Sequence, residues 1–288
     1  MKRIKHFLFL PLALSYNVMA MTIDDICNDF STLSEKILTA EKKIHESSIK
    51  EDISLHKDEK AFVSMNRISP GQNGISYKGI CYNLMAKSKD GVSLPELKFH
   101  EGKATLSLER AKKAIIGPKN RIILLDGHHS YIGAMLAGAL TFPLHIIDDW
   151  SYLGVDEFWK KMIQKEYVFF ADYLSKDNRP PLFFSQLIND SLRGAIDESL
   201  ILINSENKAE IFRPESAGLR FENQMIPFCE FKLARILYNK GVKIPKESRF
   251  PHPIEIIQII HRELKKLDDE QLIGIKVFDK IQKYVHLN

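Results

Sequence analysis

The chain has 288 residues, of which 44% are hydrophobic and 27% are charged, and its formal net charge is +4 at neutral pH. This hydrophobic content is ample for a packed globular core. The first twenty residues hold three Lys or Arg and no Asp or Glu, so removing them lowers the net charge from +4 to +1. A protein that coats nucleic acid through bulk positive charge is therefore excluded, although a local basic patch remains compatible with the sequence.

The first twenty residues have the features of a secretory signal peptide. Lys2, Arg3 and Lys5 precede an apolar run from Phe7 to Leu14, and small or tolerated residues end at Ala20. The run is shorter than the roughly 20 apolar residues that cross a bilayer, and no later segment approaches that length. We expect an exported protein, periplasmic or secreted, with no transmembrane segment in the mature chain. An uncleaved membrane anchor is the alternative.

An amphipathic helix is predicted at the start of the mature chain. Apolar residues recur every three or four positions from Ile23 to Leu38, which is typical of a helix over 22–45 with one buried face. A polar linker follows this helix. We assign residues 21–55 to the helix and linker together.

The next segments alternate between strand and helix patterns. Residues 61–65 have strand character and end at a loop, 69–74, that is rich in Pro, Gly and Asn. Residues 106–116 predict a short helix, stopped by Gly117 and Pro118. Residues 122–125 form a continuous apolar run, typical of a strand that is buried on both faces.

A helix and a further strand complete this part of the chain. Apolar residues from Ile132 to Leu140 repeat with helical spacing, and residues 141–149 return to strand character. A strand, a helix and a strand within about thirty residues predict a βαβ unit with parallel strands and a right-handed crossover.

The second half of the chain is predicted to be helical. Strand signals nearly disappear after residue 151, and prolines fall between the amphipathic patterns, where they suit helix starts and connections. The predicted helices cover residues 154–163, 182–203, 226–240, 251–267 and 269–285.

The three cysteines, Cys27, Cys81 and Cys229, lie far apart and form no C-x-x-C pair. This spacing argues against a zinc knuckle and against a thioredoxin-type motif. An exported chain with three cysteines holds at most one intramolecular disulfide, whose pairing stays open. Three buried free cysteines are the alternative.

The most informative segment runs from Arg121 to Ala134. An apolar strand leads into Asp126 and Gly127, and two adjacent histidines open the next helix. The first turn of a helix presents unpaired backbone N–H groups and the positive end of the helix dipole. This corner therefore predicts a site for an anionic group.

Several side chains at this corner are candidates for chemistry. His128 and His129 suit acid/base catalysis or anion and metal binding, but consecutive helical residues diverge by about 100°, so one of them is expected to be structural. Asp126 is suited to orient a histidine, and a helix cap is an equal alternative. Ser130 is a candidate phosphate contact, unless its hydroxyl only satisfies local backbone. Gln72 could approach the same pocket, unless it is an exposed turn residue.

Residues after the second strand are weaker candidates. Asp148 and Asp149 would emerge at the same sheet edge as the histidines if the strands are parallel, where they are candidate metal ligands, although solvated loop charges or a helix cap are the favoured explanation. Trp150, Phe158 and Trp159 offer a base-stacking platform, but their spacing along a helix favours the core.

Together with the Asp126–His129 corner, further segments occur in an order that resembles the ParB-like nucleases of the ParB/sulfiredoxin superfamily. The ordered series covers most of residues 61–260. These segments are Pro70-x-Gln72, Asp148–Ser151, Phe158–Met162, Asn189–Arg193 and Pro227–Phe231.

The resemblance implies an α+β fold. A small mixed-sheet ParB/sulfiredoxin-like domain, which includes the βαβ unit, is expected over residues 56–150. A helical C-terminal region is expected over residues 151–288. In those relatives the corresponding corner lies at a helix N-terminus that binds nucleotide phosphate.

By this resemblance, the phosphate-binding candidates are Gly127, Ser130, Gln72 and Arg193. In the relatives an arginine commonly follows the turn, whereas Ser130 and Tyr131 follow it here. The bidentate clamp that an arginine provides is therefore missing from that place. Arg193, Arg121 or Lys87 would have to supply the charge from elsewhere.

Two classes of function follow. The first is an exported nuclease or nucleotide-phosphate enzyme, with His128 or His129 as acid/base and Asp126 as its partner. Its substrate would be nucleic acid or a nucleotide, and a divalent cation is a candidate cofactor. The alternative is a noncatalytic module on a ParB-like scaffold that binds a ligand or a protein, which the missing arginine and the near-neutral charge favour.

Overall fold

The computed structural model of the chain describes residues 27, 30–47, 54–85, 106–175, 181–196, 219–221, 224–226, 228–244 and 254–265. The predicted signal peptide, residues 1–20, and the predicted last helix, residues 269–285, lie outside these ranges. In the described part of the chain, no helix is both long and apolar enough to cross a membrane.

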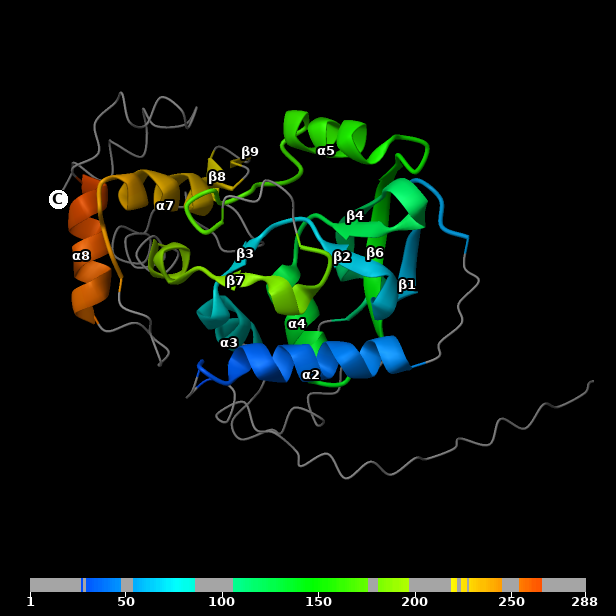
Figure 1. Ribbon diagram of the computed structural model, residues 1–288, viewed down its shortest axis with the longest axis horizontal. Helices are drawn as coiled ribbons and strands as arrows, with labels where there is room; N and C mark the ends of the chain where they lie inside the picture. The colour runs from blue at the N-terminus through cyan, green and yellow to red at the C-terminus, as the bar shows by residue number, and fades with distance from the viewer. Residues whose placement is uncertain are drawn as a thin grey trace, which may run out of the picture.

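The centre of the fold is a five-stranded mixed sheet in the order β1-β6-β4-β5-β2 (Figure 1). Strand β1 is antiparallel to β6, β6 is parallel to β4, β4 is antiparallel to β5, and β5 is parallel to β2. The strands are β1 (Lys60–Ser64), β2 (Ile68–Pro70), β4 (Lys112–Ile116), β5 (Ile122–Leu124) and β6 (Thr141–Asp149).

Helices cover both faces of this sheet. The helices α2 (Leu33–Glu46), α3 (Tyr77–Met85) and α4 (His128–Leu136) lie on one side, and α5 (Val155–Gln164) lies on the other (Figure 1). The alternation of side chains along a strand explains the two cores. In β4, Ala114 and Ile116 pack with α2, α3 and α4, whereas Ile115 packs with α5.

Smaller elements complete the described chain. A two-stranded parallel sheet joins β3 (Gly74–Ile75) to β7 (Ile188–Asn189), and β8 (Leu219–Phe221) forms a hairpin with β9 (Gln224–Ile226). The last described helices are α7 (Cys229–Asn239) and α8 (Ile254–Lys265), and the 3-10 turns are η1 (Met65–Arg67), η2 (Leu108–Arg110), η3 (Pro118–Asn120) and η4 (Phe184–Gln186).

Several predicted elements are confirmed. The strands at 61–65, 122–125 and 141–149 correspond to β1, β5 and β6. The helix that opens at the two histidines is α4, and the patterns at 154–163, 226–240 and 251–267 correspond to α5, α7 and α8. Helix α2 occupies the second half of the helix predicted over 22–45.

The helix predicted over residues 106–116 is wrong. Only Leu108–Arg110 forms a 3-10 turn, and Lys112–Ile116 is strand β4 in the middle of the sheet. The short apolar run fits a buried strand as well as a helix, and hydrogen bonding to both β5 and β6 decides for the strand.

The predicted βαβ unit is also wrong. Strand β4 lies between β5 and β6, parallel to β6 and antiparallel to β5, so β5 and β6 run in opposite directions. Helix α4 therefore connects two antiparallel strands that are not neighbours. The direction of a strand depends on pairing partners that are distant in the sequence, which local periodicity does not report.

The C-terminal half is not wholly helical as predicted. It contains β7, β8 and β9, and the predicted helix over 182–203 begins instead with η4 and β7. Residues 191–196 of that range are helical. Pairing with β3, more than 110 residues earlier in the chain, draws residues 188 and 189 into a strand.

A disulfide joins Cys27 to Cys81 of α3, with the two Cα atoms 5.6 Å apart and the two residues 54 positions apart in the sequence. The pairing that the sequence left open is thus Cys27 with Cys81. The bond ties the segment before α2 to the helix beside α4, because α3 and α4 pack against each other.

We expect the double variant Cys27→Ser/Cys81→Ser to lower the free energy of unfolding by about 2 to 4 kcal/mol, since the unfolded chain loses a cross-link. Urea denaturation of the mature protein measures this loss. As a control, a reductant should destabilise the wild type by a similar amount and leave the double variant unchanged. An equal effect of the reductant on both proteins would contradict this role of the disulfide.

Candidate functional site

The corner between β5 and α4 has the strand-turn-helix form that the sequence predicts. Strand β5 ends at Leu124 and α4 begins at His128, with Gly127 in the left-handed region at φ +83°. The Gly127 carbonyl accepts the first helical hydrogen bond, from the Tyr131 N–H at 2.8 Å. A Cβ on residue 127 would lie 2.7 Å from the Lys112 side chain, so glycine is needed for its backbone angle and for its size.

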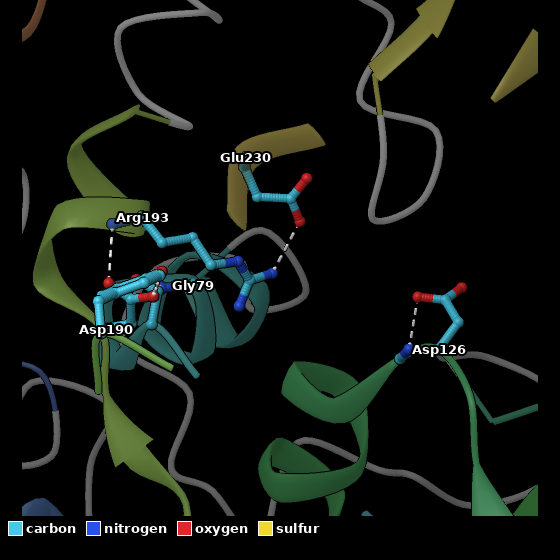
Figure 2. Close-up of polar contacts among 8 residues, drawn as sticks. Gly79, Asp126, Asp190, Arg193 and Glu230 are labelled. Carbon is cyan, nitrogen blue, oxygen red and sulfur yellow. Dashed lines mark hydrogen bonds and ion pairs between the residues drawn. The ribbon is translucent and has the colours of Figure 1, made fainter. Parts of the chain in front are cut away.

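Asp126 contacts the corner backbone and a lysine. Its Oδ1 accepts a hydrogen bond of 2.6 Å from the Gly127 N–H, and its Oδ2 lies 3.8 Å from Lys112 Nζ. Both side chains of this ion pair are about one-quarter to one-third exposed. Figure 2 shows Asp126 at the start of α4. The carboxylate that was expected to orient a histidine or to cap the helix pairs instead with Lys112.

His128 is buried and bound to the fold. Its Nε2 accepts a hydrogen bond of 3.0 Å from the Gly71 backbone N–H, and its side chain lies beside the Phe184 ring. Burial, together with the positive charge of Arg193, lowers the pKa of His128 to about 3. The imidazole is thus neutral at physiological pH and positions the loop after β2. It does not offer Nε2 to a substrate or a metal.

His129 lies against helix α3. A Cβ on Gly79 would be 2.5 Å from His129 Nε2, so only a glycine at position 79 permits this close contact. The Nε2 atom is buried, although the residue as a whole is partly exposed. Ser130, next in the helix, is partly exposed. A proton transfer by His129 would therefore have to use Nδ1.

Arg193 is a buried cation near the corner. Its Nη2 lies 3.1 Å from Glu230 Oε1, and its guanidinium stacks over the Phe231 ring at 4.1 Å. Figure 2 shows the Arg193 side chain extending toward Glu230, apart from Asp126. The positive charge of Arg193 is the second cause, after burial, of the lowered pKa of His128.

Two more buried groups complete this polar cluster. Asp190 Oδ1 accepts a hydrogen bond of 3.0 Å from the Arg193 N–H, and Asp190 Oδ2 accepts one from the Tyr173 hydroxyl. Burial raises the pKa of Asp190, and burial together with the Asp190 charge raises the pKa of Tyr173. Tyr173, Asp190 and Glu230 are not among the candidates predicted from the sequence. The last two do lie within the segments that carry the family resemblance.

Gln72 belongs to a buried loop. The residue is only 5% exposed and forms a parallel bridge with Phe169. Its neighbour Asn73 exchanges two hydrogen bonds with Ala171, at 2.9 and 3.2 Å. An exposed turn at Gln72 is therefore excluded, and Gly71, one residue before it, contacts His128.

Asp148 and Asp149 lie at the opposite edge of the sheet from the corner. Asp149 pairs with Ile116 at one end of β4, whereas Leu124, which leads into the corner, pairs with Ala114 toward the other end. The expectation of a shared edge is wrong because β6 is not parallel to β5. Asp149 instead accepts a hydrogen bond from the Ser151 N–H, and Asp148 pairs with Lys57.

The aromatic candidates are core residues, as their spacing favoured. Trp150 and Phe158 are buried with α5, and Trp159 packs against Phe158 with ring centroids 4.9 Å apart. Arg121 lies at the start of β5, away from the corner, and Lys87 lies outside the described residues.

Within the described ranges, no group of three or more His, Cys, Asp or Glu side chains is arranged to hold a metal ion.

We expect Gly71→Ala to lower the free energy of unfolding by about 1 to 3 kcal/mol, because the new Cβ would lie 2.4 Å from the Leu124 carbonyl oxygen. Urea denaturation measures the change. Gly154→Ala is the matched control, since nothing lies within 4 Å of its Cβ position. Equal losses in the two variants would show that residue 71 is not tightly enclosed.

We expect His128 to make stability depend on pH. Its pKa is about 3 in the folded chain and near 6.5 in the unfolded chain, so the unfolded state binds more protons between these values. The stability that this group contributes is fully present above pH 6.5 and is lost as the pH falls toward 3. This loss amounts to about 2 kcal/mol between pH 7 and pH 5.

Denaturation of His128→Gln at both pH values tests this expectation, because glutamine accepts the Gly71 hydrogen bond without titrating. The difference in stability between pH 7 and pH 5 should shrink by about 2 kcal/mol in the variant. His56→Gln, at an exposed position, should keep the wild-type difference. An unchanged pH dependence in His128→Gln would contradict a neutral, buried imidazole.

Three comparisons with known proteins gave different results. A search of curated proteins found no match. Among solved structures, the crystal structure of protein Atu1540 from Agrobacterium tumefaciens matches with a TM-score of 0.49 and 16% identity, covering 75% of this chain and 96% of that chain. Residues 61–192 match the sequence model of the family described as "Putative ParB-like nuclease", which confirms the resemblance over that range.

Proposed function

We propose that this chain is an exported ParB-like protein with nuclease-like activity on a nucleic acid or nucleotide, and that the substrate phosphate lies at the corner between β5 and α4. The observation that carries the proposal is that this corner, with its glycine-led helix start, lies inside the range that matches the nuclease family.

Three sources of positive potential support phosphate binding at the corner. The N-terminus of α4 contributes the helix dipole and backbone N–H groups, with Gly127 and Ser130 in the first turn. Lys112 Nζ lies beside Asp126 at the surface. Arg193 adds a buried charge that reaches His128. In this proposal Lys112 contacts the phosphate, while Arg193 and the Gln72 loop shape the site behind it.

In this proposal the partly exposed side chains, Asp126 and His129, carry out the hydrolysis. Asp126 is placed to orient a water molecule against a phosphate held by Lys112, and His129 would exchange a proton through Nδ1. His128 acts as a positioning residue, since its Nε2 already binds Gly71. A divalent cation stays a candidate cofactor through Asp126, which is an oxygen donor of the kind that such ions prefer.

Export is part of the proposal. The disulfide between Cys27 and Cys81 supports it, because such bonds persist in oxidising compartments such as the periplasm or the extracellular space. An extracellular nucleic acid would then be the more accessible substrate.

A noncatalytic module is the second candidate. The contacts of both imidazoles with their own fold favour it, since His128 binds Gly71 and His129 packs against Gly79. In that case the corner would bind a phosphate-containing ligand without turnover. Hydrolysis assays and ligand calorimetry separate the two candidates.

We expect purified mature protein to cleave DNA, RNA or a nucleotide when assayed with and without Mg²⁺ or Mn²⁺. Asp126→Asn and Lys112→Met should each lower kcat by about 10²-fold, because each removes a charge at the reacting phosphate. Asp149→Asn, at the opposite sheet edge, is the matched control and should retain activity.

Absence of cleavage with DNA, RNA and nucleotide substrates would contradict the catalytic proposal. Calorimetric binding of a nucleotide that is lost in Lys112→Met would then support the noncatalytic module. Equal losses of activity in Asp126→Asn and Asp149→Asn would place the chemistry away from the corner.

A further inference from the structure

Three basic side chains lie in one row across the sheet. Lys60 of β1 is directly opposite His145 of β6, and His145 is opposite Lys113 of β4. Neighbouring strands are about 4.8 Å apart, so the backbones of the two lysines are separated by about 10 Å. We call these three residues the lysine row.

The lysine row lies on the face of the sheet that α5 partly covers. Leu144 and Ile146, on either side of His145, and Ala114, next to Lys113, all pack into the core beneath α2, α3 and α4. Because side chains alternate along a strand, His145 and Lys113 point to the opposite face. Both lysines are exposed and His145 is half-buried. An exposed lysine on β4, a central strand, shows that this end of the face is open to solvent.

Within the described residues, neither lysine of the row forms an ion pair. The carboxylate of Asp148, farther along β6, does not neutralise them because it pairs with Lys57 at 3.6 Å. Lysine on the edge strand β1 also discourages edge-to-edge association, but that role does not account for Lys113 on a central strand. The two lysines lie on strands that β6 separates, so they repel each other weakly across about 10 Å, and a bound polyanion would offset this repulsion.

The lysine row leads to the corner. The Leu125 N–H donates a hydrogen bond of 3.0 Å to the Lys113 carbonyl, so the row continues across β4 to the residue before Asp126. The adjacent Lys112 pairs with Asp126 from the other face of β4. The row and the corner therefore lie at the same end of the sheet but on opposite faces, and a chain of phosphates lying along the row reaches the α4 N-terminus by passing round this end of the sheet.

We propose that the lysine row binds the phosphate backbone of a nucleic acid strand and guides it to the corner. Two ammonium groups on strands about 10 Å apart suit a repeating polyanion better than a single phosphate. The inference rests on the proposed function for what happens at the corner, but strand binding by the row can be measured without turnover.

The experiment measures binding of a fluorescent single-stranded dT oligonucleotide to the full mature chain by anisotropy, between 50 and 200 mM salt. Lys60→Ala/Lys113→Ala should weaken binding about tenfold at the lowest salt. It should also reduce the slope of log affinity against log salt by about 1.4, since each lost phosphate contact contributes about 0.7. Lys60→Arg/Lys113→Arg should restore both values.

Lys42→Ala/Lys43→Ala is the matched control, because it removes the same charge from exposed positions on α2, on the other side of the sheet. It should leave affinity within about twofold and the salt slope unchanged. Equal weakening in both double variants, or no binding by the wild type, would overturn the inference. Binding that depends on the row without any cleavage would support the row while the catalytic proposal fails.

Discussion

The hydrogen bond from the Gly71 N–H to His128 Nε2 fixes the corner relative to the sheet. It joins the end of β2 to the first residue of α4, across 57 residues of sequence. Since Nε2 must accept this bond, the ring has to be neutral, and its burial enforces that state. Two residues farther along, two hydrogen bonds between Asn73 and Ala171 hold the same loop in place. Of the two histidines predicted as acid/base candidates, His128 is thus a structural residue that holds the corner against the loop after β2.

A neutral His128 cannot balance the charge of a carboxylate, so the ions near the corner pair with one another. A buried guanidinium needs a carboxylate partner, and Arg193 obtains one from Glu230 on α7. The positive charge available to a ligand at the surface of the corner is then the helix terminus together with Lys112, whose own partner Asp126 is partly exposed. The two ion pairs therefore differ in depth: Arg193 and Glu230 are buried, whereas Lys112 and Asp126 are partly exposed at the surface, where a ligand can reach them.

The sequence predicts the elements that bury one clear face, and it fails where pairing between distant segments decides. Strands β1, β5 and β6 and helix α4 follow from periodicity and turn residues. Strand β4 does not, because its five residues fit either period and only hydrogen bonding to both neighbours selects the strand. The positions of Asp148 and Asp149 depend on the direction of β6, which no local pattern encodes.

The candidate site, like the fold, has local features that the sequence predicts and long-range contacts that it does not. The corner and its glycine are evident in the sequence, because their geometry is local, but the partners of His128 and Arg193 come from distant segments. Some contacts that support the corner also involve residues outside 61–192, the range that matches the family. Glu230 neutralises Arg193, Glu41 of α2 accepts hydrogen bonds from the Phe184 and Ser185 N–H groups, and Cys27 is bonded to Cys81. Cutting the chain at the limits of the match would remove Arg193 together with Glu230, and it would leave the turn at Phe184 without the carboxylate of Glu41. The segments on both sides are therefore part of the structure that forms the corner.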